Sequence, residues 1–133
     1  MTVGVLVVTI AISAQAVAGF VRQAVTDEPS ALEKVETCLT ERATRYEDAN
    51  DDFIASSAGR GALRTTVGGN AVTVAIGESE NDAKRVHDDY TAVMTSGATT
   101  LLDLHGRVVL LWDREPTEAQ RAFIYLCTLD VQP

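Results

Sequence analysis

Residues 63–76 read LRTTVGGNAVTVAI, and they contain two short stretches in which apolar and polar side chains alternate. Alternation with a period of two is typical of a strand with one buried face. The residues between the two stretches, 68–70, are two glycines and an asparagine, which suit a tight turn. A turn at the two glycines pairs Thr65 with Val72 and places the apolar side chains of both strands on one face. The stretch therefore predicts a β-hairpin and its register.

Helical periodicity is found in three further segments. In residues 30–46 apolar side chains recur at steps of three and four, which predicts a first helix that frays in 47–52. A serine caps a second helix over 79–95, and Thr117 with Gln120 forms a capping box that begins the third. The side chains that these periods turn inward are Leu32, Val35, Leu39, Ala43 and Tyr46 in the first helix, Ala83, Val86, Tyr90, Val93 and Met94 in the second, and Ala119, Phe123, Leu126 and Cys127 in the third.

The carboxyl-terminal part contains a second candidate hairpin. Residues 101–104 and 107–112 flank a His-Gly pair at 105–106, and the continuous apolar run 108–112 is typical of a central strand covered on both faces. The order over 30–133 is then α-β-β-α-β-β-α. We expect an α+β fold in which helices pack on an antiparallel sheet of three or four strands.

The amino-terminal segment carries no charge. Residues 1–21 read MTVGVLVVTIAISAQAVAGFV, and the 11 Lys and Arg and 19 Asp and Glu side chains of the chain all lie from Arg22 onward. A helix of this length spans about 31 Å, close to the hydrocarbon thickness of a bilayer. We therefore interpret residues 1–22 as a transmembrane anchor or signal segment, 23–29 as a linker and 30–133 as a soluble domain.

Two alternatives to an uncleaved anchor stay open. Ala16, Val17 and Ala18 have the small-x-small form of a signal cleavage site, in which case the domain is secreted. A buried helix of a soluble protein is the other alternative. The first basic side chain, Arg22, follows the segment, and the positive-inside rule taken alone places the domain in the cytoplasm.

The two cysteines, Cys38 and Cys127, argue for the opposite orientation. They form no Cys-x-x-Cys motif, and both fall on the apolar side of a predicted helix. A disulfide between them would close a loop of about 90 residues, worth about 4–5 kcal/mol in chain entropy. We predict this disulfide against the alternative of two unrelated buried thiols. Disulfides persist in oxidising compartments, so we expect a single-pass membrane protein with its domain outside the cytoplasm.

The soluble part carries the whole formal net charge of −8. Such a surface repels nucleic-acid phosphates, and no cluster of Lys and Arg offsets it, so we expect no nucleic-acid partner. The lack of a basic patch also argues against peripheral binding to anionic lipid heads. Membrane contact is expected through residues 1–22.

No motif predicts a catalytic, cofactor-binding or metal site. Residues 48–52 (DANDD) match the opening of a calcium loop, but the required Gly and Glu are replaced by Phe53 and Gly59. The two histidines, His87 and His105, serve one site only if the second helix and the second hairpin turn converge.

These observations favour a membrane-anchored, extracytoplasmic, non-enzymatic domain that binds a partner protein, a cell-envelope component or another copy of itself. One alternative is a pilin-like structural subunit, because an apolar helix before an amphipathic helix, a sheet and a terminal cysteine resembles the layout of type IV pilins. Those proteins typically carry an acidic residue at the fifth mature position, and residues 1–21 contain none. The second alternative is a small-ligand carrier or an enzyme that uses His87 and His105.

Overall fold

The computed structural model describes residues 28–95 and 98–133, so the predicted anchor and most of the predicted linker lie outside the described residues. Among the described residues, no helix is both long enough and apolar enough to cross a membrane. In chain order the elements are α2 (Ala31–Glu41), β1 (Tyr46–Asp48), the short helix η1 (Ala55–Ser57), β2 (Ala62–Val67), β3 (Asn70–Ile76), α3 (Glu80–Val93), η2 (Ala98–Leu101), β4 (Leu102–His105), β5 (Val108–Trp112), α4 (Glu118–Thr128) and η3 (Leu129–Val131). Helices and one antiparallel sheet make the α+β fold that the sequence predicts.

The sheet has five strands in the order β1-β2-β3-β5-β4, and all its neighbours are antiparallel. The predicted hairpin is confirmed in its register, because Thr65 pairs with Val72 and Leu63 with Val74. Gly68 has φ 54° and the next glycine has φ 77°, which are the two positive angles of a turn that matches the strand twist. The second hairpin is also confirmed, and β5 lies between β3 and β4.

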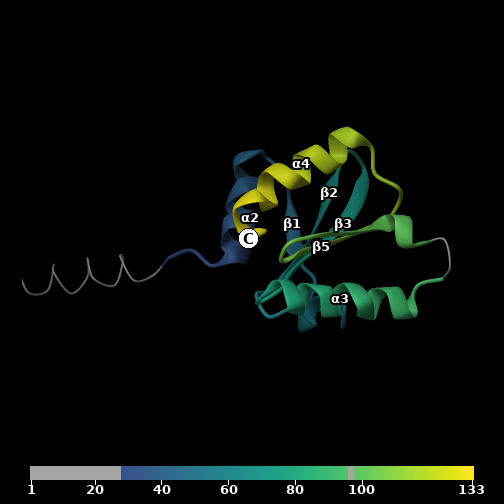
Figure 1. Ribbon diagram of the computed structural model, residues 1–133. Helices are drawn as coiled ribbons and strands as arrows, with labels where there is room; N and C mark the ends of the chain where they lie inside the picture. The colour runs from purple at the N-terminus through teal and green to yellow at the C-terminus, as the bar shows by residue number, and fades with distance from the viewer. Residues whose placement is uncertain (1–27, 96–97) are drawn as a thin grey trace, which may run out of the picture.

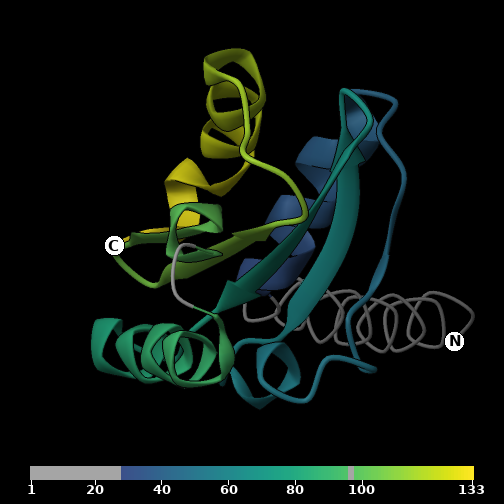
Figure 2. The same cartoon turned by 90° about the vertical axis from the view of Figure 1, so that its right-hand side faces the viewer.

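Helices cover the two faces of the sheet unequally. Helices α2 and α4 pack on one face and α3 packs on the other, as Figure 1 shows. The core under α2 and α4 contains large side chains from both helices and from the sheet, including Leu39, Leu63, Leu110, Trp112 and Ile124. The core under α3 is rich in alanine, and its members are Ala49, Ala55, Ala58, Ala62, Ala75, Ala83, Val86, Tyr90, Leu102 and Val109. Small side chains bring α3 close to the sheet, and that helix covers only one end of the strands (Figure 2).

The prediction that the first helix continues to residue 46 is wrong. Helix α2 ends at Glu41, and Ala43 has φ 55° in the left-handed region. The amide of Thr44 bonds to the carbonyl of Leu39 at 2.8 Å, which closes the helix as a Schellman motif does. The chain then extends, and Tyr46 pairs with Thr65 in β1, where the sequence suggested a fraying helix. The sheet therefore has five strands, one more than the largest number expected.

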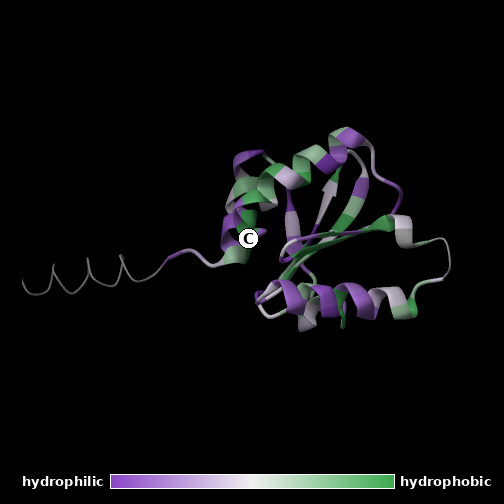
Figure 3. Ribbon diagram, in the orientation of Figure 1, coloured by the Kyte–Doolittle hydropathy of each residue, from purple (hydrophilic) through white to green (hydrophobic). Residues whose placement is uncertain are grey.

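The capping predictions for the other two helices are confirmed. The Ser79 hydroxyl accepts a bond from the amide of Asp82, and Thr117 and Gln120 form the complete capping box. The buried side of α4 differs from the prediction by about one residue, because Ile124 and Thr128 are buried. The predicted inward residues Ala119 and Leu126 are exposed on α4, and so is Val93 at the end of α3. Figure 3 shows hydrophobic and hydrophilic segments mixed along both helices.

Candidate functional site

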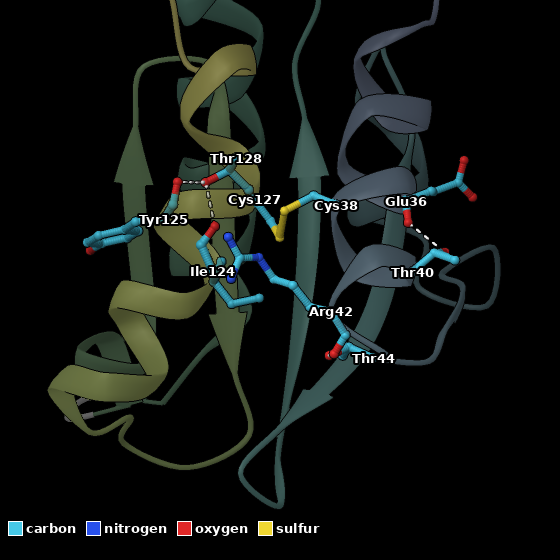
Figure 4. Close-up of a disulfide and its surroundings, with 9 residues drawn as sticks. All are labelled: Glu36, Cys38, Thr40, Arg42, Thr44, Ile124, Tyr125, Cys127 and Thr128. Atoms are coloured by element: carbon cyan, nitrogen blue, oxygen red, sulfur yellow. Dashed lines mark hydrogen bonds between the residues drawn. A yellow bond between two sulfur atoms is a disulfide. The ribbon is translucent and has the colours of Figure 1, made fainter.

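The disulfide predicted from the sequence is present. Cys38 on α2 and Cys127 on α4 are joined with a Cα–Cα distance of 5.3 Å across 89 positions of the chain (Figure 4). Beside this bond the guanidinium of Arg42 lies 5.8 Å from the ring centroid of Phe123, so a second contact links the same two helices. The bond fixes the helical layer on one side of the sheet. A disulfide of this kind is typical of proteins that mature in an oxidising environment outside the cytoplasm.

The opposite side of the sheet is partly uncovered, and this region is the candidate site. We call the open face the side chains of Arg64 and Thr66 on β2, Ala71 and Thr73 on β3, and Leu111 on β5, because strand alternation places all of them on the α3 side. These strands reach well beyond α3 toward the hairpin tip (Figure 2). Two solvent-open hollows lie over them, one of about 660 Å³ next to β1 and one of about 430 Å³ toward β5.

The loop after β1 borders the open face and is held at several points. Asp52, which lines the smaller hollow, accepts bonds on Oδ1 from the amides of Ile54 and Ala55, both at 3.0 Å. Its other oxygen, Oδ2, accepts a 2.6 Å bond from the hydroxyl of Tyr90 on α3. Ala49 and Ala55 are buried on either side of Asp52. The loop is therefore anchored to α3 by both polar and apolar contacts.

This anchored loop presents an exposed aromatic ring. Phe53 is 89% exposed, the highest value for a large apolar side chain in the described part of the chain. On the neighbouring part of the loop and on β1, the acidic side chains of Asp51 and Glu47 pair with Arg64 Nη1 at 3.3 and 3.8 Å. The side chain of Arg64 is mostly covered, with 28% of it exposed, whereas both acids are largely in solvent. The site thus combines an apolar projection, a hollow and charges of both signs.

Two ionisable side chains near the loop, Tyr90 and Asp82, have shifted pKa values that favour the hydrogen bonds they make. Burial raises the pKa of Tyr90 strongly, and the bond to the Asp52 carboxylate raises it further. The phenol therefore stays a donor at ordinary pH. Nearby, the amides of Glu78 and Gly59 both donate to Asp82 Oδ2 at 2.8 Å and lower the pKa of that carboxyl group. These hydrogen bonds hold the ends of the loop against α3. None of these groups forms a pair suited to acid–base catalysis.

A second polar cluster lies on the α4 side, at the other edge of the sheet. The Tyr125 hydroxyl lies 2.6 Å from Nε2 of His105, and burial, with the charge of Asp103 second, raises the pKa of that phenol. Asp103 also accepts a bond from the indole of Trp112 and pairs with Arg121. The cluster joins β4 to α4, and the Tyr125–His105 pair lines neither hollow of the open face.

The two histidines do not converge. His105 at the end of β4 pairs with Val108 of β5 and faces α4. His87 lies on α3, on the opposite side of the sheet, next to Asp88. The shared site that an enzyme using both histidines requires is therefore not formed. Among residues 28–95 and 98–133, no group of three His, Cys, Asp or Glu side chains is placed to hold a metal ion.

The calcium-like run has a structural role. Asp48 accepts a bond from the amide of Asn50 at 3.2 Å, and Asp52 caps the turn into η1. The exposure of Phe53 and the pairing of Tyr90 with Asp52 were not predicted from the sequence. A local signal for the turn did exist, because an aspartate whose carboxylate accepts bonds from the amides two and three positions later is typical of a capped turn.

Comparison with known proteins finds no matching family model, no similar curated protein and no matching solved structure. Function is therefore inferred from the geometry of this chain.

Proposed function

We propose that this chain is a membrane-anchored, extracytoplasmic module that acts by binding and has no catalytic activity. The observation that carries the proposal is the disulfide between Cys38 and Cys127, which favours an oxidising compartment. The uncharged segment 1–21 supplies the means of export or anchoring. A cytoplasmic domain would keep both thiols reduced, so the disulfide outweighs the position of Arg22.

The exposed features support binding. Phe53 projects from an anchored loop beside an open sheet face, and aromatic side chains are enriched at the centres of interfaces. The hollows are open and lined largely by Thr, Ala and charged side chains, unlike the enclosed apolar pockets that hold small ligands. A protein surface is therefore a better partner for these hollows than a small ligand.

The pilin-like alternative gains no support from the described residues. Helix α2 begins at its own N-cap, where the hydroxyl of Ser30 accepts a bond from the amide of Glu33 at 3.2 Å. Residues 28–30 before it are not helical, whereas the pilin layout has the apolar helix running directly into the amphipathic one.

A topology assay tests the proposal. A reporter enzyme active only outside the cytoplasm is fused after Pro133, and a reporter active only inside is fused at the same position. We expect activity from the first fusion alone. Non-reducing intact mass of the chain recovered from membranes should be lower by two hydrogens than that of the reduced chain. Activity of the cytoplasmic fusion alone would contradict the orientation, and free thiols in the intact mass would remove its main support.

A further inference from the structure

We propose that the outer edge of β1 binds an extended, basic segment of a partner protein, which adds to the sheet as a new antiparallel strand. This inference rests on the proposed binding function and names the chemistry of its partner. Its support is the outward-facing backbone of β1, a groove along that edge and the acidic side chains at one end of the groove.

Strand β1 is an outer strand of the sheet that the described residues form, and its neighbour there is β2. The tight turn of the β2–β3 hairpin determines which backbone groups of β2 bond to β3, and alternation then turns those of Arg64 toward β1. Arg64 lies opposite Glu47, so the backbone N–H and C=O groups of the flanking residues Tyr46 and Asp48 point away from β2. Outward donors and acceptors on an outer strand are the template for strand addition.

A groove runs along this edge between β1 and helix α2. Two hollows, of about 310 and 430 Å³, meet at Thr40 and Tyr46, and we call them together the edge groove. Glu33 and Glu36 line one end of the edge groove, and Arg45 lines the other. Figure 4 shows Glu36 and Thr40 on the side of α2 that faces away from the disulfide. The edge groove therefore follows the strand whose backbone is turned outward.

The side chains on this side of the edge select for basic residues. Asp48 lies opposite Leu63, a member of the core under α2, so Asp48 and, by alternation, Tyr46 have their side chains on the α2 side. Residues of an added strand opposite these two also direct their side chains to this side. One of them meets the carboxylates of Glu33 and Glu36 beside the Tyr46 ring, and the other meets Asp48. Lysine or arginine at alternate positions suits this arrangement, since carboxylates and an aromatic face both attract cations.

The charge of the rest of the chain favours the same partner. A formal net charge of −8 attracts a basic segment and repels an acidic one. Within the described part of the chain, neither Glu33 nor Glu36 takes part in an ion pair, whereas Glu47 on the α3 side of β1 is paired with Arg64. The carboxylates at the end of the edge groove are therefore the ones open to a new cation.

Binding of a defined peptide to the full chain in non-ionic detergent tests the proposal. The probe is a fluorescent seven-residue peptide with blocked ends, in which threonine and lysine alternate. Fluorescence anisotropy should show saturable binding, and hydrogen exchange should slow at the amides of Tyr46 and Asp48. Raising the salt from about 0.01 M to about 0.1 M shortens the Debye length from about 30 Å to about 10 Å and should weaken binding.

Two methylated peptides separate strand addition from attraction by charge alone. In an antiparallel strand with its lysines on the α2 side, the lysine amides face β1 and the threonine amides face solvent. Methylation of the lysine backbone nitrogens should weaken binding about tenfold or more, because each methyl group removes a main-chain hydrogen bond. Methylation of the threonine nitrogens is the matched control and should leave binding unchanged. Equal affinity of all three peptides would overturn strand addition.

Two double variants test the acidic end of the edge groove. Glu33→Gln with Glu36→Gln should raise the dissociation constant of the unmethylated peptide about three- to tenfold. Glu80→Gln with Asp88→Asn removes the same charge from α3 and should change it by less than about twofold at 0.1 M salt. A non-reducing intact mass that shows the disulfide verifies that each variant folds.

Three outcomes overturn the proposed partner. They are the absence of saturable binding, equal weakening by both double variants, and protection of β4 amides in place of those of Tyr46 and Asp48. A topology reporter still active outside the cytoplasm would then leave the proposed compartment standing, so the two failures are distinguishable.

Discussion

The hydroxyl of Tyr90 donates a 2.6 Å hydrogen bond to Oδ2 of Asp52, joining residues that are 38 positions apart in the chain. Tyr90 is 4% exposed and lies on the packed side of α3, so the bond forms at the edge of the alanine-rich core. The other oxygen of the same carboxylate caps the turn that follows Phe53. The side chain of Asp52 therefore couples the position of the exposed Phe53 ring to helix α3.

Tyr90→Phe should loosen this coupling without removing the ring from the core. The loss of a hydrogen bond to a charged, partly buried group should lower the free energy of unfolding by about 1–3 kcal/mol. Urea unfolding of the full chain in detergent measures this change, and hydrogen exchange should show faster exchange at the amides of Ile54 and Ala55. Tyr46→Phe is the control, because that tyrosine is 40% exposed on β1 and should change stability by less than about 0.5 kcal/mol. Equal effects from the two variants would refute the role of the Asp52 bond.

Local signals in the sequence predicted the elements whose geometry is locally determined. Two adjacent glycines with positive φ define the β2–β3 turn, and the register follows from it. Thr117 and Gln120 define the start of α4 through the groups they cap. The disulfide was predictable because each cysteine lies on the apolar side of a helix, and the sheet places those two helices side by side.

Long-range contacts produced the features that the sequence did not predict. Strand β1 forms because Tyr46 pairs with Thr65, and the Thr65 hydroxyl donates a 2.6 Å bond to the carbonyl of Arg45. The αL conformation of Ala43 has no local signal, because alanine seldom adopts it. The open face was not predictable from any one segment, since β2, β3 and β5 each supply part of it. The exposure of Phe53 likewise depends on how the whole loop packs, since Ala55 two positions later is buried.

Asp82→Asn should destabilise the chain in a pH-dependent manner. The amides of Glu78 and Gly59, and then Arg85, lower the pKa of Asp82 below its ordinary value of 3.8. A lowered folded-state pKa stabilises the fold above the unfolded pKa, and this contribution is lost as the pH falls through the folded pKa. We expect a loss of about 1–3 kcal/mol at pH 7 and a smaller difference from the native chain below about pH 4.

Urea titrations of both chains between pH 7 and pH 3 measure this convergence. Asp88→Asn is the control, because that carboxylate is 64% exposed on the same helix and pairs with the adjacent His87 at 3.4 Å. A difference for the Asp82 variant that stays constant across this pH range would argue against an ionised acceptor at this position.

Ala43→Gly should stabilise the chain. Ala43 has φ 55° in the turn that ends α2, and a Cβ atom in this region costs about 1 kcal/mol relative to glycine. Part of that gain is lost to the greater freedom of glycine in the unfolded chain, so we expect a net increase of about 0.5 kcal/mol. A higher urea midpoint at an unchanged slope is the measurement. Ala122→Gly on the exposed side of α4 should lower stability by about 1 kcal/mol, and a loss at both positions would contradict the strain at Ala43.

Replacing both cysteines by alanine should lower the free energy of unfolding more than the loss of either the Tyr90 or the Asp82 hydrogen bonds. The bond spans 89 positions, and chain-entropy arithmetic for a loop of this length gives about 4–5 kcal/mol, within the range of about 2–5 kcal/mol for native disulfides of small domains. The Cys38→Ala, Cys127→Ala chain and the reduced native chain should unfold at similar urea concentrations, well below the oxidised native chain. Reductant should shift the native midpoint and leave that of the double variant unchanged. Because Cys127 packs in the core with Leu39 and Ile124, part of the loss in the variant comes from packing, and the reduced native chain isolates the contribution of the crosslink. An oxidised native chain no more stable than its reduced form would show that the helical layer holds together without the bond.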